Sequence, residues 1–325
     1  MSTRIATFCT SVMLLCSLWI APVFSEPYPD HPIRIVVPGA AGSVPDVFVR
    51  RLSDHMSRTL GQPIVVDNRA GANGFIGAEA AARAKPDGYT LAYGAINVLA
   101  INPALFAQMP YDPVRDFAPV SMIARGYPIL IVNPSLPVKT LSEFVDYARA
   151  RPGKVTYGSP GVGSLQHIAT ELLQQLTGID LVHVPYKNQP QVMTDLIGGQ
   201  LDAAVEYHSV AVPQIKAGKV RALVIVGPKR KPAIPDIPTA QEAGLPAFQA
   251  AGWAGFLVPA GTSREIIEKL NKATIAALAQ PQFLEWIAGN GTEAVPSTPE
   301  EFAAYIKAET VKWSKVIKDA KVKVE

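Results

Sequence analysis

Small residues between a strand pattern and a helix start could bind an anion. Residues 33–37 form a β-branched run bounded by prolines, which is typical of a buried strand. Residues 39–43 are too small to keep a ligand from the backbone, and helical spacing begins at Pro45. Free N–H groups and the positive end of a helix dipole would point at one spot. The lysine and Ser/Thr of a nucleotide P-loop do not occur there, so a carboxylate is a simpler ligand to expect than a nucleotide.

A second segment of the same kind lies in the middle of the chain. Gly161 and Gly163 let the backbone approach a ligand, and Ser164 stands where a helix N-cap belongs. The alternative, that these glycines only turn the chain, stays open.

Catalytic and metal-binding patterns are incomplete. Ser164 and His167 lie three apart, but the G-x-S-x-G elbow does not occur around them. Residues 71–77 match a dinucleotide fingerprint poorly, and the five histidines have no metal-ligand spacing. The sequence predicts no enzyme, no cofactor and no metal.

The start of the chain indicates export. Arg4, an apolar stretch at 12–20 and a small-residue site before Glu26 predict a secretory signal peptide over residues 1–25, with an uncleaved anchor as the alternative. Both cysteines, Cys9 and Cys16, fall inside it, so no disulfide is expected in the mature chain. We therefore expect a periplasmic protein of a Gram-negative bacterium. A net charge of +3 over 325 residues argues against nucleic acid.

The elements that must position these loops form two α/β series. Strand and helix signals alternate from 33 to 125 and again from 129 to 226, which indicates βαβ units around mostly parallel sheets. We expect two Rossmann-like lobes with a hinge, and crossings near 124–127 and 251–255. Lobe 1 would comprise residues 26–125 and 253–325, and lobe 2 residues 126–252. Helix starts are indicated by capping boxes at Thr140, Thr239, Thr262 and Thr298. The last helix has an aromatic and apolar stripe at three- and four-residue spacing, which indicates core packing; its residues are Phe302, Tyr305, Ile306, Trp313, Val316 and Ile317.

The mature chain resembles the Bug family, the extracytoplasmic solute-binding proteins of tripartite tricarboxylate transporters. The resemblance is carried by YPDHPIRIVVP at 28–38, PDGYTL at 86–91, INPAL at 101–105, TYGS at 156–159, HVPYK at 183–187 and GGQLD at 198–202. It implies a type II periplasmic-binding-protein (Venus-flytrap) fold that closes on a carboxylate. It also implies permease subunits as partners, and we expect the receptor to be a monomer.

In that family two loops hold the ligand carboxylate through backbone amides, and they correspond here to residues 39–46 and 159–167. The expected ligand-binding residues, including positions where this chain departs from the family, are Ala40, Ala41, Gly42, Ser43, Asp46, Phe75, Asn97, Ser159, Gly161, Gly163, Ser164, His167, Tyr186, Lys187 and Glu206.

The departures favour a less polar ligand. Ser43-Val44-Pro45 replaces a more hydroxylated stretch, which removes two hydroxyls and one N–H. Apolar candidates for a cleft wall are Phe75, Ile96, Val98, Leu99 and Trp253. The hypothesis is an apolar-bodied or aromatic mono- or dicarboxylate, unless these residues belong to the lobe core. A sensory role, in which the closed protein presents its ligand to a membrane sensor kinase, is the alternative to transport.

Overall fold

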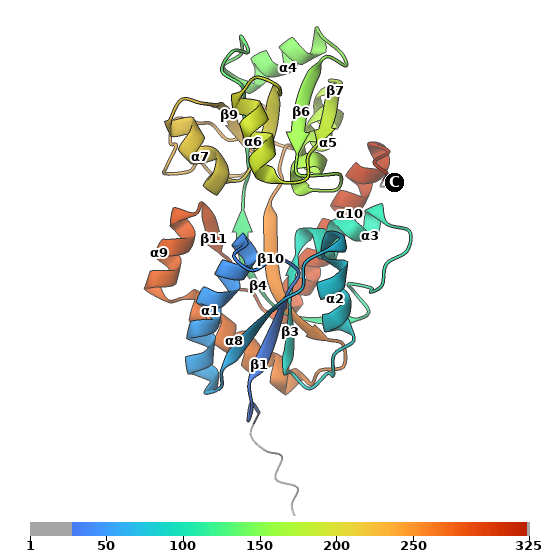
Figure 1. Ribbon diagram of the computed structural model, residues 1–325, viewed down its shortest axis with the longest axis vertical. Coiled ribbons are helices and arrows are strands. Elements are labelled where there is room, and N and C mark those ends of the chain that lie inside the picture. The colour runs from blue at the N-terminus through green and yellow to red at the C-terminus, as the bar shows by residue number, and fades with distance from the viewer. Residues whose placement is uncertain (1–27, 324–325) are drawn as a thin grey trace, which may run out of the picture.

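Two sheets, each covered by helices, divide the chain into two lobes (Figure 1). The computed structural model describes residues 28–323, so the expected signal peptide lies outside the described residues. The first sheet has the strand order β11 (Thr292–Ala294), β4 (Phe117–Gly126), β10 (Gly252–Pro259), β3 (Thr90–Ala95), β1 (Ile33–Val37), β2 (Ile64–Asn68). The second has the order β7 (Leu181–Pro185), β6 (Val155–Ser159), β8 (Ala203–Glu206), β5 (Ile129–Val132), β9 (Arg221–Ile225).

The helices follow the same division. With the first sheet lie α1 (Val44–Leu60), η1 (Ala72–Gly74), α2 (Phe75–Ala82), the π-helix η2 (Asn97–Ile101), α3 (Asn102–Leu105), α8 (Arg264–Leu278), α9 (Pro281–Gly289) and α10 (Pro299–Asp319). With the second lie α4 (Leu141–Arg149), α5 (Leu165–Thr177), α6 (Gln189–Ile197) and α7 (His208–Lys216). The two predicted α/β lobes are confirmed. Among residues 28–323, no helix is both long enough and apolar enough to cross a bilayer.

Both sheets are mixed, whereas the sequence predicted mostly parallel ones. β1 pairs in parallel with β2 and β3, and β6 with β7 and β8. However, β10 is antiparallel to β3 and β4, and β5 is antiparallel to β8 and β9. The reason in the first sheet is that β4 carries the chain toward the second lobe and β10 brings it back. Two adjacent strands that lead in opposite directions can pair only as an antiparallel ladder.

The capping predictions are partly right. Thr140 and Thr298 cap α4 and α10, and Thr298 forms the complete reciprocal box with Glu301. The prediction at Thr262 was wrong by one residue, because Ser263 caps α8 while the Thr262 hydroxyl donates to the Pro259 carbonyl at 2.7 Å.

At Thr239 the two bonds of a capping box do form with Glu242, at 2.8 and 3.2 Å. Residues 240–244 are turn rather than α-helix, so the predicted helix does not follow. The same side-chain pair therefore closes a turn here.

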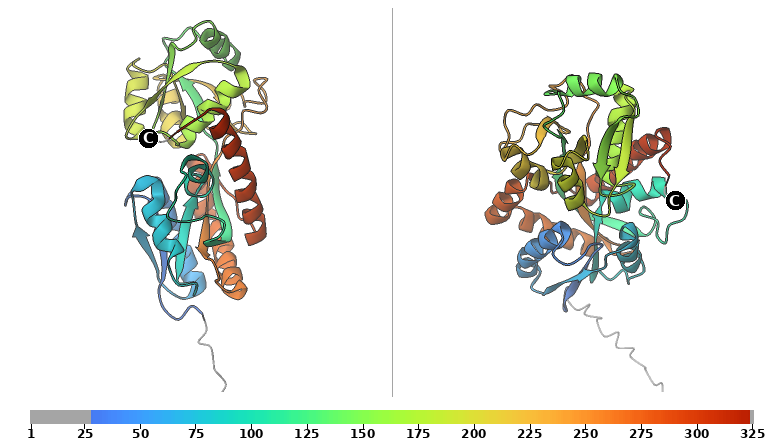
Figure 2. Two further views of the ribbon diagram at one scale, coloured as in Figure 1. Left: turned by 90° about the vertical axis from the view of Figure 1, so that its right-hand side faces the viewer. Right: turned by 45° about the horizontal axis from the view of Figure 1, so that its top comes forward.

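Helix α10 packs against both lobes. It contacts η2, α3 and β4 of the first lobe and α5 of the second, and Figure 2 shows it running along one lobe and reaching the other. Trp313 is fully buried in a core cluster that contains residues of both lobes. The Gln175 side chain of α5 donates to the Val316 carbonyl of α10 at 2.7 Å. The aromatic stripe predicted to be core is core, and it joins the lobes on one side.

We predict that Trp313→Ala lowers the free energy of unfolding by about 3–5 kcal/mol, because it leaves a large hole in the shared cluster. Val311→Ala is the matched control, since Val311 lies on the same helix with 66% of its side chain exposed. It should change the free energy of unfolding by less than about 0.5 kcal/mol. Urea unfolding measures both, and equal losses would contradict the assigned role of Trp313.

Candidate functional site

A cavity of about 590 Å³ lies between the lobes. From the first lobe it is lined by the start of α1, the η1 loop (residues 71–74), the end of β3, the strand ends at 124–126 and 252–254, and the turn at 290–292. From the second lobe it is lined by Gln189 and by residues 207–210. This volume is typical of a small-molecule site.

The first predicted loop reaches this cavity at the start of α1. Val44 and Pro45 line it. The N–H of Gly42, whose φ is +79°, donates to the Asp46 carboxylate at 2.9 Å, and Arg50 Nε donates to the same carboxylate at 2.9 Å. The Arg50 guanidinium is the largest of the influences that hold the pKa of Asp46 below its usual value. Asp46 is buried, and its bonds hold the loop in shape.

The second predicted loop has the same arrangement. Gly163, with φ +81°, donates its N–H to His167 Nδ1 at 3.1 Å, and Ser164 caps α5 by accepting from the His167 N–H at 3.2 Å. Because Nδ1 accepts a bond, the ring proton is on Nε2. Burial, and then the neighbouring His183, lowers the pKa of His167 to about 3, so the ring is neutral. Both loops therefore contain Gly-Ser, and in both the glycine N–H donates to a buried side chain four residues further along the chain.

Stacked rings support the second loop from behind. The His167 and His183 rings are 3.9 Å apart and 9° from parallel, and the Tyr157 ring lies 4.9 Å from His183 and 6.3 Å from His167, within 21° of parallel to both. The Ser159 hydroxyl lies 2.7 Å from His183 Nε2 and donates to the Gly161 carbonyl at 3.0 Å. Ser159 and His167 therefore shape the loop from within.

The second loop touches the first lobe directly. Asn97 Nδ2 donates to the Gly163 carbonyl at 3.3 Å, and a methyl group on Gly163 would overlap Leu105. Asn97 lines the cavity, whereas residues 159–167 do not. The sequence placed both loops around one ligand, and the structure brings only the first loop and Asn97 to the cavity wall.

The remaining predicted residues differ in position. Ala40, Ala41 and Gly42 are exposed, and the Ser43 hydroxyl is buried without a described partner. Phe75 packs edge-on against Phe106 and Tyr111 and does not line the cavity.

Two further predicted residues lie outside the cavity. The Tyr186 hydroxyl donates to Asp195 at 2.7 Å, and Lys187 is exposed beside the start of α6. Neither lines the cavity.

Glu206 is fully buried above the cavity. One carboxyl oxygen accepts from the Gln189 side chain, and the other has no partner among the described residues. Burial raises the pKa of Glu206 to about 7. Gln189 thus stands between Glu206 and the cavity.

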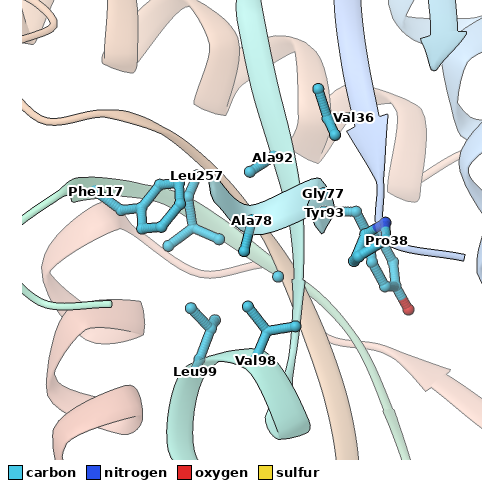
Figure 3. Close-up of a pocket in the computed structure, with 11 residues that line it drawn as sticks. Val36, Pro38, Gly77, Ala78, Ala92, Tyr93, Val98, Leu99, Phe117 and Leu257 are labelled. Carbon is cyan, nitrogen blue, oxygen red and sulfur yellow. The ribbon is translucent and has the colours of Figure 1, made fainter. Parts of the chain in front are cut away.

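The predicted apolar wall is present in part. Ile96, Val98 and Trp253 line the cavity. Leu99 instead borders a void of about 10 Å³ under α2, which Val98 also touches (Figure 3). That void has about the volume of one water probe, so it belongs to the core packing.

Sequence reasoning missed the second lobe's contribution. Tyr207, His208 and Ser209 directly follow β8 and bring the N-terminus of α7 to the cavity, and Tyr93 faces them from β3. Their position in the sequence could have indicated this, because residues that follow the carboxyl ends of strands form the binding sites of open α/β sheets. Within residues 28–323, no group of three or more His, Cys, Asp or Glu side chains could hold a metal ion.

Comparisons with known proteins agree in fold and family. The family model described as "Tripartite tricarboxylate transporter family receptor" matches residues 48–322. The chain is 36% identical to protein BugT of Bordetella pertussis over 306 residues, 94% of each chain.

Solved structures of periplasmic proteins are similar over nearly the whole chain. One, a periplasmic transporter, is 40% identical, with a TM-score of 0.80 over 92% of this chain and 100% of that one. Rpa4515 of R. palustris with adipate is 34% identical, with a TM-score of 0.80 over 91% and 99%. MatC of Rhodopseudomonas palustris with bound malate is 35% identical, with a TM-score of 0.76 over 89% and 100%.

We predict that Gly163→Ala destabilises the protein more than Gly178→Ala. Both glycines have positive φ, so both changes cost roughly 1–2 kcal/mol of backbone strain. Only the methyl at 163 meets a neighbour, Leu105, which adds an overpacking cost of about 1–3 kcal/mol. Urea unfolding compares the two variants, and equal stability would show that the 163 loop does not pack on the first lobe as described.

We predict that Glu206 makes stability fall as pH rises. Burial raises the pKa of Glu206 to about 7 in the folded state, from an ordinary value of 4.5, so the folded state binds more protons between these pH values. When the pH rises from 4.5 to above 7, the free energy of unfolding of the wild type should fall by on the order of 3 kcal/mol relative to that of Glu206→Gln. The histidines with lowered pKa values titrate in both proteins and cancel in the difference. Parallel stability profiles would rule out a buried titrating carboxyl at this position.

Proposed function

The chain belongs to the tripartite tricarboxylate transporter receptor family, and from this premise we propose that it captures a small carboxylate outside the cytoplasmic membrane and delivers it to the permease subunits of such a transporter. Members of this family are receptors rather than enzymes. The proposal places the protein in the periplasm, as a monomer, after removal of residues 1–25.

The observation that carries this proposal is the electrostatic character of the cavity. Three helices, α1, α6 and α7, begin at its wall. The N–H groups of His208 and Ser209 bond to no described residue, as is usual in a first helical turn. Among the described residues that line the cavity there is no aspartate, glutamate or lysine, and the arginine there, Arg125, lies 3.6 Å from the carboxylate of Glu293. Helix N-termini without competing acids favour an anion.

The relatives support a carboxylate. The solved structures that hold adipate and malate are 34% and 35% identical to this chain. Backbone donors bind such a group without a charged side chain.

The body of the proposed ligand is apolar or aromatic. Phe48, Ile96, Val98 and Trp253 supply apolar surface to the cavity. Removing an apolar ligand body from water against this surface contributes about 25 cal/mol per Å² buried. A ligand ammonium finds no acid among the described residues of the wall, and a buried ammonium without a partner is costly.

Capture is proposed to involve closure of the lobes, with lobe 1 formed by residues 26–125 and 253–325 and lobe 2 by 126–252. A ligand that contacts both lobes favours the closed arrangement by its differential affinity. The crossings between β4 and β5 and before β10 supply the hinge.

We predict that titration calorimetry detects binding of adipate or benzoate, and little or none of glutamate or citrate. The reason is that the wall offers apolar surface to the ligand body but no acid for the ammonium of glutamate, and the hydroxyl and third carboxylate of citrate would lose water against that apolar surface. Small-angle scattering should show a smaller radius of gyration with the bound acid. Preferential binding of glutamate or citrate would overturn the proposed ligand class, and no binding of any carboxylate would overturn the proposed function.

A further inference from the structure

Two tyrosines face the inter-lobe cavity from opposite sides. Tyr93 lies on β3 of the first lobe, and Tyr207 is the N-cap residue of α7 in the second. Both line the cavity. In Figure 3 the Tyr93 ring extends past Pro38, away from the apolar side chains of the small void.

Neither phenol has a hydrogen-bond partner within residues 28–323. By contrast, Tyr111 donates to the Val98 carbonyl at 2.8 Å and Tyr157 to Glu171 at 2.6 Å. Burial raises the pKa of both cavity tyrosines, so each keeps its proton and remains a donor. Both tyrosines are half-buried and line the cavity, so each hydroxyl is free to donate to a molecule bound there.

The two tyrosines line the same cavity from opposite lobes. Tyr93 is also among the groups that raise the pKa of Tyr207. The Tyr207 hydroxyl lies over Gly252, where any side chain would overlap it. The pair thus stands at the strand end of the cavity, with one donor on each lobe.

We propose that the Tyr93 and Tyr207 hydroxyls form a second anionic subsite that receives the far carboxylate of a dicarboxylate ligand. Two neutral donors that face no acid on the cavity wall match two carboxylate oxygens. This inference rests on the proposed function, in which the first carboxylate binds at the helix N-termini.

Glu206 directly precedes Tyr207 in the chain and does not line the cavity. Its buried carboxyl is protonated over much of the range below about pH 7, so it opposes a second carboxylate only weakly there. Because each lobe supplies one donor, the far carboxylate of a dicarboxylate adds a contact to each lobe that a monocarboxylate lacks. The subsite therefore favours dicarboxylates over monocarboxylates, and the same contacts favour closure of the two lobes.

The test uses titration calorimetry at pH 6 with three matched pairs of acids: succinate and butyrate, adipate and hexanoate, terephthalate and benzoate. The proteins are the wild type, Tyr93→Phe, Tyr207→Phe and the double variant. Tyr147→Phe is the control, because Tyr147 lies on α4, away from the cavity, and donates no described hydrogen bond from its hydroxyl. Melting curves establish that each variant is folded.

We expect the wild type to prefer the diacid in at least one pair. Each single change should weaken that diacid roughly tenfold and leave the monoacid nearly unchanged, since one charge-assisted bond is lost. The double variant should lose the preference, and Tyr147→Phe should keep it. A wild type that binds monoacids as well as diacids, or variants that keep the preference, would overturn the subsite alone. A wild type that binds none of the six acids would overturn the proposed function and the subsite with it.

Discussion

The structure around the cleft depends on unpaired backbone N–H groups at helix starts. Each predicted loop contains Gly-Ser, and a buried side chain four residues after the glycine, Asp46 or His167, accepts the glycine N–H. That bond fixes a left-handed glycine conformation that other residues adopt at a cost. The remaining N–H groups at the start of each helix then keep a fixed direction. A carboxylate can be held by such groups without a charged side chain. The cavity wall carries no described lysine, and its arginine, Arg125, lies 3.6 Å from the carboxylate of Glu293.

The two sides of the cleft differ in how they hold the lobes together. On the α10 side a continuous apolar cluster joins the lobes, and Trp313 is buried within it. On the cavity side Lys231 donates to the Gly291 carbonyl at 2.8 Å, and the His208 ring lies against the same glycine. Opening the α10 side would expose the apolar cluster around Trp313, so motion that admits a ligand is expected on the cavity side.

Sequence patterns predicted the elements well and their partners less well. The strand at 33–37, the box at Thr298 and the core stripe of α10 depend on neighbours in the chain, which a sequence displays directly. The antiparallel pairing of β10, the bridging of the lobes by α10 and the burial of Glu206 depend on residues far apart in the chain. Among site residues, the loop glycines can be recognised from their neighbours in the sequence. Tyr93 and Tyr207 line one cavity only because the two lobes lie together in the fold. Neither has a spacing that distinguishes a cavity tyrosine from a core one.

The central claim is that backbone N–H groups at helix starts, rather than charged side chains, hold the ligand carboxylate between the lobes. A crystal structure of the protein with a bound acid tests this most directly. We predict that the ligand carboxylate lies within hydrogen-bond distance of N–H groups in the first turn of α1 or α7, and that both lobes contact the ligand. A carboxylate paired with a lysine or arginine side chain, or bound outside the cleft, would contradict it.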